Sequence, residues 1–178
     1  MPKKYSGDDA PRRQSASKSR ITLRKVSDEP AYELVYPRCV AERAEDMEEV
    51  YEMIRMGETE AAEDELLWLL TDCPELLEAH QLLGELALAQ GNLARAQAHF
   101  GRAFELGLAA LPPGKLPGRL PAKLPGNTPF FHAGKGLAVT LKQLGHRKLA
   151  QEVVHRLLDL DPQDPLRLRE ILRSEETG

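Results

Sequence analysis

A set of small and bulky residues that recurs at fixed distances restricts the fold of this sequence more than any other feature. Gly57 and Gly91 are 34 residues apart, and Gly145 opens a third copy of the same set. Counted from each glycine, the fifth residue is Ala62, Ala96 or Ala150, the ninth is Leu66, Phe100 or Val154, and the twelfth is Leu69, Ala103 or Leu157. A period of this length is typical of architectures in which one supersecondary unit stacks on the next.

Each copy is expected to consist of two helices joined at the glycine. Before Gly57, apolar residues recur at positions i, i+3, i+4 and i+7, which is the spacing of one helix face. Asn92 follows the second glycine and is expected to N-cap the next helix. Pro74, which ends the first copy, is expected at the first position of the helix after it.

The second copy carries the most complete motif, in the stretch LLGELALAQGNLARAQAHFGRAFEL from Leu82 to Leu106. A helix–turn–helix of this period, with the Leu83-Gly84 pair before the turn, resembles the tetratricopeptide repeat. The third copy has Leu137-Ala138 in place of Leu-Gly, and the first has Glu49-Val50. The resemblance covers repeats at about 43–76, 77–110 and 131–164. It implies an all-α fold, a short right-handed superhelix of antiparallel helix pairs, with a capping helix at 165–173 that begins after Asp164.

A segment rich in proline, leucine and glycine, residues 111–130, separates the second and third repeats. It holds six of the 13 prolines of the chain, a density that excludes a helix and favours extended backbone. Three interpretations stay open: a loop whose leucines cover apolar surface, a plug folded into a groove, or a recognition element offered to a partner. Thr128 and Pro129 are expected to be the N-cap and first residue of the following helix.

Charge is distributed unevenly along the chain. Residues 1–26 carry a net charge of +6 and the rest carries −10, which gives the total of −4. Residues 1–30 are poor in apolar side chains, so we expect a disordered basic tail, followed by an extended linker at 31–42. From Glu42 to Glu78 there are 14 acidic and two basic residues, which we interpret mainly as a solvated helix face.

Two cysteines, Cys39 and Cys73, are too few for a disulfide framework and are expected to be reduced thiols. They also lack the close Cys/His spacing of a structural zinc site. No stretch approaches the roughly 18 apolar residues of a membrane span, so no membrane contact is expected. The charged N-terminus lacks the apolar stretch of a signal peptide, and reduced thiols fit a cytosol, so a cytoplasmic location is predicted.

No catalytic residue, metal site or cofactor is predicted, and the chain is not expected to be an enzyme. HAGKG, from His132 to Gly136, lacks the Ser/Thr and the earlier glycine of a phosphate-binding loop. Close helix packing is the favoured explanation of its two glycines, with ligand contact as the alternative. The five histidines show no metal-ligand spacing, and His80 is expected to have a packing role.

The resemblance implies a groove lined by the first helix of each repeat, which binds a peptide or a partner helix. By position, that groove would present Met47, Tyr51, Ile54, Gln81, Glu85, Leu88, Lys135, Val139 and Lys142. The Lys and Asn residues with which one subtype holds the carboxylate ends of chaperone tails are absent. We therefore expect a non-catalytic adaptor for a protein or peptide of unknown identity, without a small-molecule substrate. The alternative is a nucleic-acid-associated factor that uses the basic residues 1–26, while the repeats recruit a protein.

Overall fold

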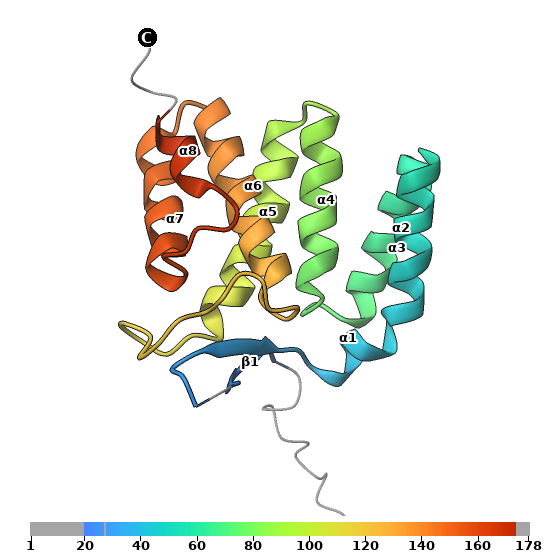
Figure 1. Cartoon of the computed structure of the whole chain (residues 1–178). Helices are drawn as coiled ribbons and strands as arrows, with labels where there is room; N and C mark the ends of the chain where they lie inside the picture. The colour runs from blue at the N-terminus through green and yellow to red at the C-terminus, as the bar shows by residue number, and fades with distance from the viewer. Residues whose placement is uncertain (1–19, 27, 174–178) are drawn as a thin grey trace, which may run out of the picture.

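The chain is mostly helical. A computed structural model describes residues 20–26 and 28–173, and Figure 1 shows the arrangement of their elements. In chain order these are β1 (Thr22–Lys25), β2 (Tyr32–Val35), α1 (Arg38–Glu42), α2 (Ala44–Met56), α3 (Thr59–Asp72), α4 (Leu77–Ala89), α5 (Leu93–Ala109), α6 (Thr128–Gln143), α7 (Arg147–Leu160) and α8 (Leu168–Arg173). The all-α class predicted from the sequence is confirmed at this level.

The three helix pairs α2–α3, α4–α5 and α6–α7 are joined by turns of the same backbone structure. Gly57, Gly91 and Gly145 have φ values of 80°, 74° and 82°, a left-handed conformation that glycine adopts without a steric penalty. In each turn the glycine N–H donates to the carbonyl three residues back, and the next N–H donates to the carbonyl five residues back. This is the Schellman motif that commonly ends a helix. The sequence period therefore corresponds to a repeated turn structure.

Phe100 shows why small residues recur beside the bulky ones. Its ring lies between Gly84 of α4 and Gly136 of α6, so that an added Cβ at Gly84 would lie 2.6 Å from a ring carbon. A Cβ at Gly136 would collide with the same ring, and one at Gly134 would lie 2.7 Å from a methyl group of Leu157. The packing explanation of the two glycines in HAGKG is confirmed.

The repeat positions supply much of the core. The residues five, nine and twelve places after each turn glycine are all buried, with exposed fractions of 3% or less. They divide between two apolar clusters. One joins α2 and α3 to one side of α4, and the other joins the two later helix pairs to the ribbon and residues 111–127.

An antiparallel ribbon of β1 and β2 lies beneath the helices in Figure 1, where the sequence predicted disorder and a linker. The prediction of a disordered tail is wrong for residues 20–26 and 28–30, and residues 1–19 lie outside the described part of the chain. The linker predicted at 31–42 contains β2 and α1. Ile21 and Leu34 are buried in the second cluster, so the ribbon has an apolar face to cover.

The segment at 111–130 is built into the core. Leu116 and Leu120 are buried, and the N–H of Leu120 donates to the carbonyl of Leu160 at 2.9 Å. Arg119 exchanges backbone hydrogen bonds with the chain around Ala31, its N–H donating to Pro30 and its carbonyl accepting from Tyr32. The leucines therefore cover apolar surface as the loop interpretation expected.

Asn127 fastens this segment to the ribbon and is fully buried. Its Oδ1 accepts from the N–H of Leu34 at 2.9 Å, and its Nδ2 donates to the carbonyls of Tyr32 and Pro121 at 3.0 Å. Because α6 begins at Thr128, Asn127 is the N-cap residue, and the prediction of Thr128 in that place is off by one. The hydroxyl of Thr128 donates to the insertion instead, at the carbonyls of Ala122 and Leu124.

Cys39 and Cys73 form a disulfide, so the prediction of two reduced thiols is wrong. Helix α1 turns back onto the end of α3, which brings their Cα atoms to 5.7 Å although they are 34 residues apart. Pro74 follows in the turn, and α4 begins only at Leu77. The argument from thiols for a cytoplasmic location is lost, and that location stays a prediction.

None of the helices in the described residues is both long enough and apolar enough to cross a bilayer.

Candidate functional site

A pocket of about 520 Å³ lies where the first helices of the three pairs meet. We call it the α2–α4–α6 pocket. It is lined by Tyr51 of α2, by Glu78, Gln81, Leu82 and Glu85 of α4, by Pro125 of the insertion, and by Thr128, Pro129 and His132 of α6. The four residues of α4 recur at helical spacing, so they lie on one face of that helix. Elements distant in the chain thus form one concave site.

Carboxylates dominate the charge around the phenol of Tyr51. Its hydroxyl donates to Glu78, and one turn along α4 the Nε2 of Gln81 donates to Glu85 at 2.7 Å. Burial raises the pKa of Tyr51 well above its ordinary value, and the hydrogen bond to Glu78 and the charges of Glu78, Glu85 and Glu48 raise it further. Each of these effects disfavours a phenolate, so Tyr51 stays a neutral hydrogen-bond donor.

Tyr36 lies close to the same negative charge. Its hydroxyl donates to the carbonyl of Gly126 at 2.8 Å, just before the start of α6. Burial first, then the charges of Glu78 and Glu33, raise the pKa of Tyr36. The electrostatic influence of Glu78 therefore extends from the pocket to the end of the ribbon.

Among the described residues, no arginine or lysine lines this pocket, and neither Glu78 nor Glu85 forms an ion pair. Some carboxylates elsewhere on the first two helix pairs do have cationic partners. Glu63 pairs with Arg95 at 2.9 Å, and Asp72 pairs with Arg43 at 2.9 Å. The α2–α4–α6 pocket is therefore a place of uncompensated negative charge.

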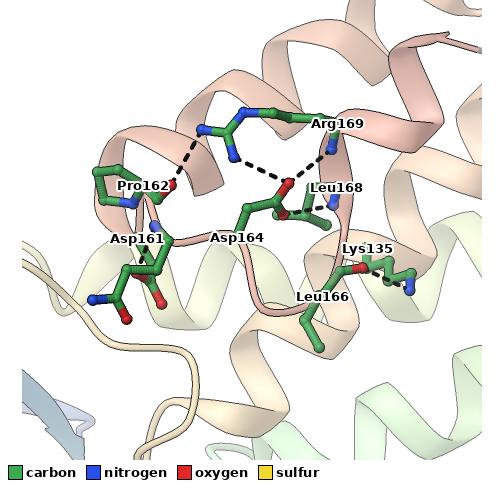
Figure 2. A network of polar contacts seen from close by, with 8 residues as sticks. Lys135, Asp161, Pro162, Asp164, Leu166, Leu168 and Arg169 are labelled. Atoms are coloured by element: carbon green, nitrogen blue, oxygen red, sulfur yellow. Dashed lines mark hydrogen bonds and ion pairs between the residues drawn. The ribbon is translucent and has the colours of Figure 1, made fainter.

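The groove residues predicted on the third repeat lie in a different hollow. Lys135, Val139 and Lys142 of α6 line a pocket of about 430 Å³ together with residues of α8. The Nζ of Lys135 donates to the carbonyl of Leu166 at 3.0 Å, as Figure 2 shows, and the Nζ of Lys142 donates to the carbonyl of Ile171 at 2.7 Å. Both ammonium groups thus hold the C-terminal segment against α6.

Asp164 organises that segment, and Figure 2 shows its contacts. Its carboxylate accepts from the backbone N–H groups of Leu168 and Arg169, and Arg169 also pairs with it through the guanidinium at 3.3 Å. The capping helix was predicted from residue 165, but α8 begins at Leu168. Asp164 and Arg167 both have positive φ, so a turn replaces the expected first helical residues.

The predicted groove residues therefore separate into three groups. Tyr51, Gln81 and Glu85 meet in the α2–α4–α6 pocket, and the three residues of α6 meet α8. Met47 is buried in the first apolar cluster, while Ile54 and Leu88 are partly buried against the two clusters. Met47 in particular contributes to the core and presents no surface to a ligand.

Sequence reasoning missed Glu78 and the wall formed by Pro125, Pro129 and His132. Glu78 could have been found, because it lies seven residues before Glu85 on the same helix face. Pro125 could not, since its place depends on the path of the insertion.

Where metals are concerned, no group of three or more His, Cys, Asp or Glu side chains in the described residues could hold an ion.

A third hollow, of about 780 Å³, lies on the other side of the helix pairs, between α5 and α7. Its walls carry both signs of charge, with Arg102 and Glu105 on α5 and Glu152 and Arg156 on α7. It contains none of the predicted groove residues.

Comparisons of the chain with known protein families, with curated proteins and with solved structures gave no match.

Proposed function

We propose that this protein is a non-catalytic interaction scaffold of tetratricopeptide-like architecture, a short right-handed superhelix that binds a protein segment along its first helices. Support for the architecture comes from the three turns, which share one hydrogen-bond pattern, and from the buried residues at equivalent distances after each glycine. Stacked units of this kind form extended concave surfaces that suit partner binding.

The α2–α4–α6 pocket is the observation that carries the functional part of the proposal. It opens on the helix faces where the repeat resemblance expects a ligand, and it unites polar groups with apolar walls. A pocket of this size with a few convergent polar groups is a reasonable candidate for a binding site. The carboxylates around it provide charge for recognition.

A pull-down from nuclease-treated native lysate tests this function. The baits are the full chain, a pocket variant with Tyr51→Arg and Glu85→Arg, and a control with Glu105→Arg and Glu152→Arg in the α5–α7 hollow. Each variant is first compared with the full chain by circular dichroism and thermal unfolding. We expect the same protein to be recovered with the full chain and the control, and lost with the pocket variant.

The other results would contradict the proposal in different ways. Loss with the control alone would place recognition in the α5–α7 hollow. Recovery of a partner from untreated lysate, run in parallel, but not from nuclease-treated lysate would favour the nucleic-acid alternative, in which the basic residues 1–26 make the contact.

A further inference from the structure

We propose that the α2–α4–α6 pocket selects a basic segment of the partner protein, with one arginine or lysine side chain placed between Glu78 and Glu85. This inference rests on the proposed function, since it names the chemistry of the ligand that the same pocket would take. Recognition in this pocket would then depend on the charge of the ligand as well as on its shape.

Uncompensated charge is the first argument. Glu78 and Glu85 lie on one face of α4, their charges act on Tyr51 together with that of Glu48, and no arginine or lysine of the described residues lines the pocket. An opposite charge brought within a few ångströms at a partly buried site is attracted far more strongly than in bulk water. The hydrogen bonds from Tyr51 to Glu78 and from Gln81 to Glu85 fix both carboxylates before the ligand arrives.

The walls of the pocket fit a long cationic side chain. Leu82, Pro125 and Pro129 provide apolar surface beside the carboxylates. The aliphatic stems of lysine and arginine pack on such surface while their charged ends reach polar groups. The ring of Tyr51 adds an aromatic face on which a guanidinium can stack. Acidic or purely apolar side chains would satisfy only part of this lining.

The net charge of the first helix pair favours a cationic ligand as well. The stretch from Glu42 to Glu78, which includes α2 and α3, contains 14 acidic and two basic residues. On α6, Lys135 and Lys142 donate hydrogen bonds to carbonyls of the C-terminal segment. Their ammonium groups are therefore already engaged within the protein. Complementary fields of this kind speed association and exclude partners of the wrong sign.

A titration with defined peptides tests the inference. The full chain, labelled with ¹⁵N, is titrated with acetyl-Ala-Arg-Ala-Arg-Ala-Arg-Ala-amide, and with matched peptides that carry citrulline or glutamate in place of arginine. We expect saturable shifts of α4 amides with the arginine peptide and at least tenfold weaker binding of the citrulline peptide. Glu78→Gln and Glu85→Gln should each weaken binding several-fold, whereas Glu105→Gln on the opposite side should leave it unchanged.

Four outcomes would overturn the inference. The first is equal binding of the arginine and citrulline peptides, and the second is an equal loss with Glu105→Gln, which would indicate non-specific attraction. The third is binding that appears only after Lys3, Lys4, Arg12, Arg13 and Lys18 are replaced by Gln, which would make the chain's own N-terminal segment the occupant. The fourth is capture of a pocket-dependent partner together with no binding of the arginine peptide. In that last case the scaffold function stands and only its basic ligand fails.

Discussion

Phe100 couples three helices through one ring, and its neighbours can be tested singly. Gly136→Ala would place a methyl group against this fully buried ring, so we expect the free energy of unfolding to fall by about 1–3 kcal/mol. Gly101→Ala is the matched control. It lies within α5 with open space around its Cα, so it should stabilise the protein by up to about 1 kcal/mol through helix propensity. Urea unfolding of both variants measures the difference, and equal effects would contradict the packing explanation.

The contact between His80 and His99 should make the free energy of unfolding depend on pH. Their Nδ1 atoms are 3.4 Å apart, and burial, then the charges of His99 and Arg102, lowers the pKa of His80 to about 4. Burial also lowers the pKa of His99, with Arg95 acting in the same direction and Glu63 against it.

Between about pH 6.5 and pH 4 the unfolded chain binds a proton at His80 that the folded chain does not. The free energy of unfolding should therefore fall as the pH falls through this window. We expect a loss of about 1–2 kcal/mol from this residue, since partial contact with water screens the ring. Urea titrations of the wild type and His80→Phe at pH 7 and pH 4.5 measure it. A variant as sensitive to pH as the wild type would contradict the assignment.

Between elements, the disulfide from α1 to the end of α3 has a measurable effect on stability. It closes a loop of 34 residues, and the chain-entropy relation gives a stabilisation of about 4 kcal/mol for a loop of that length. Reduction should lower the urea midpoint of the wild type accordingly. Cys39→Ser serves as the control, because its midpoint should not respond to reductant. A wild-type midpoint that is the same with and without reductant would show that the bond contributes nothing.

The sequence predicts the helix pairs well and their surroundings poorly, for physical reasons that differ. Gly57, Gly91 and Gly145 are local signals, because a left-handed turn needs glycine whatever surrounds it. The ribbon depends instead on Asn127 and Arg119, which lie far along the chain and supply its hydrogen bonds. The disulfide likewise requires the position of α1, which no periodicity indicates.

The residues of the candidate site were likewise predictable from the sequence only where they lie on periodic helices. Tyr51, Gln81 and Glu85 follow from repeat positions, because their helices obey the periodicity. Lys135 and Lys142 also follow from it, yet α8 and the turn before it occupy the space that they face. A non-periodic segment therefore decides which part of the groove stays open, and its path depends on tertiary packing.

For the molecule as a whole, the two apolar clusters predict unequal local stability. The helices α2 and α3 belong to one cluster, whereas α5, α6 and α7 share the other with the ribbon and the insertion. In stacked repeats each unit is stabilised mainly by its neighbours, so an end unit with one neighbour opens first. After reduction of the disulfide, we expect the amides of α2 and α3 to exchange hydrogen at least tenfold faster than those of α6. Uniform exchange along the chain would contradict this, and the oxidised protein provides the reference.

The buried side chain of Asn127 also sets an order of events during synthesis. The native acceptor of the Leu34 N–H lies 93 residues further along the chain. At ordinary rates of translation, synthesis of that length takes roughly 5–20 seconds. Throughout that interval the apolar face of the ribbon is uncovered, and the Leu34 N–H bonds only to water. The ribbon is thus synthesised well before residues 111–127, and it reaches its native place only after they have been made.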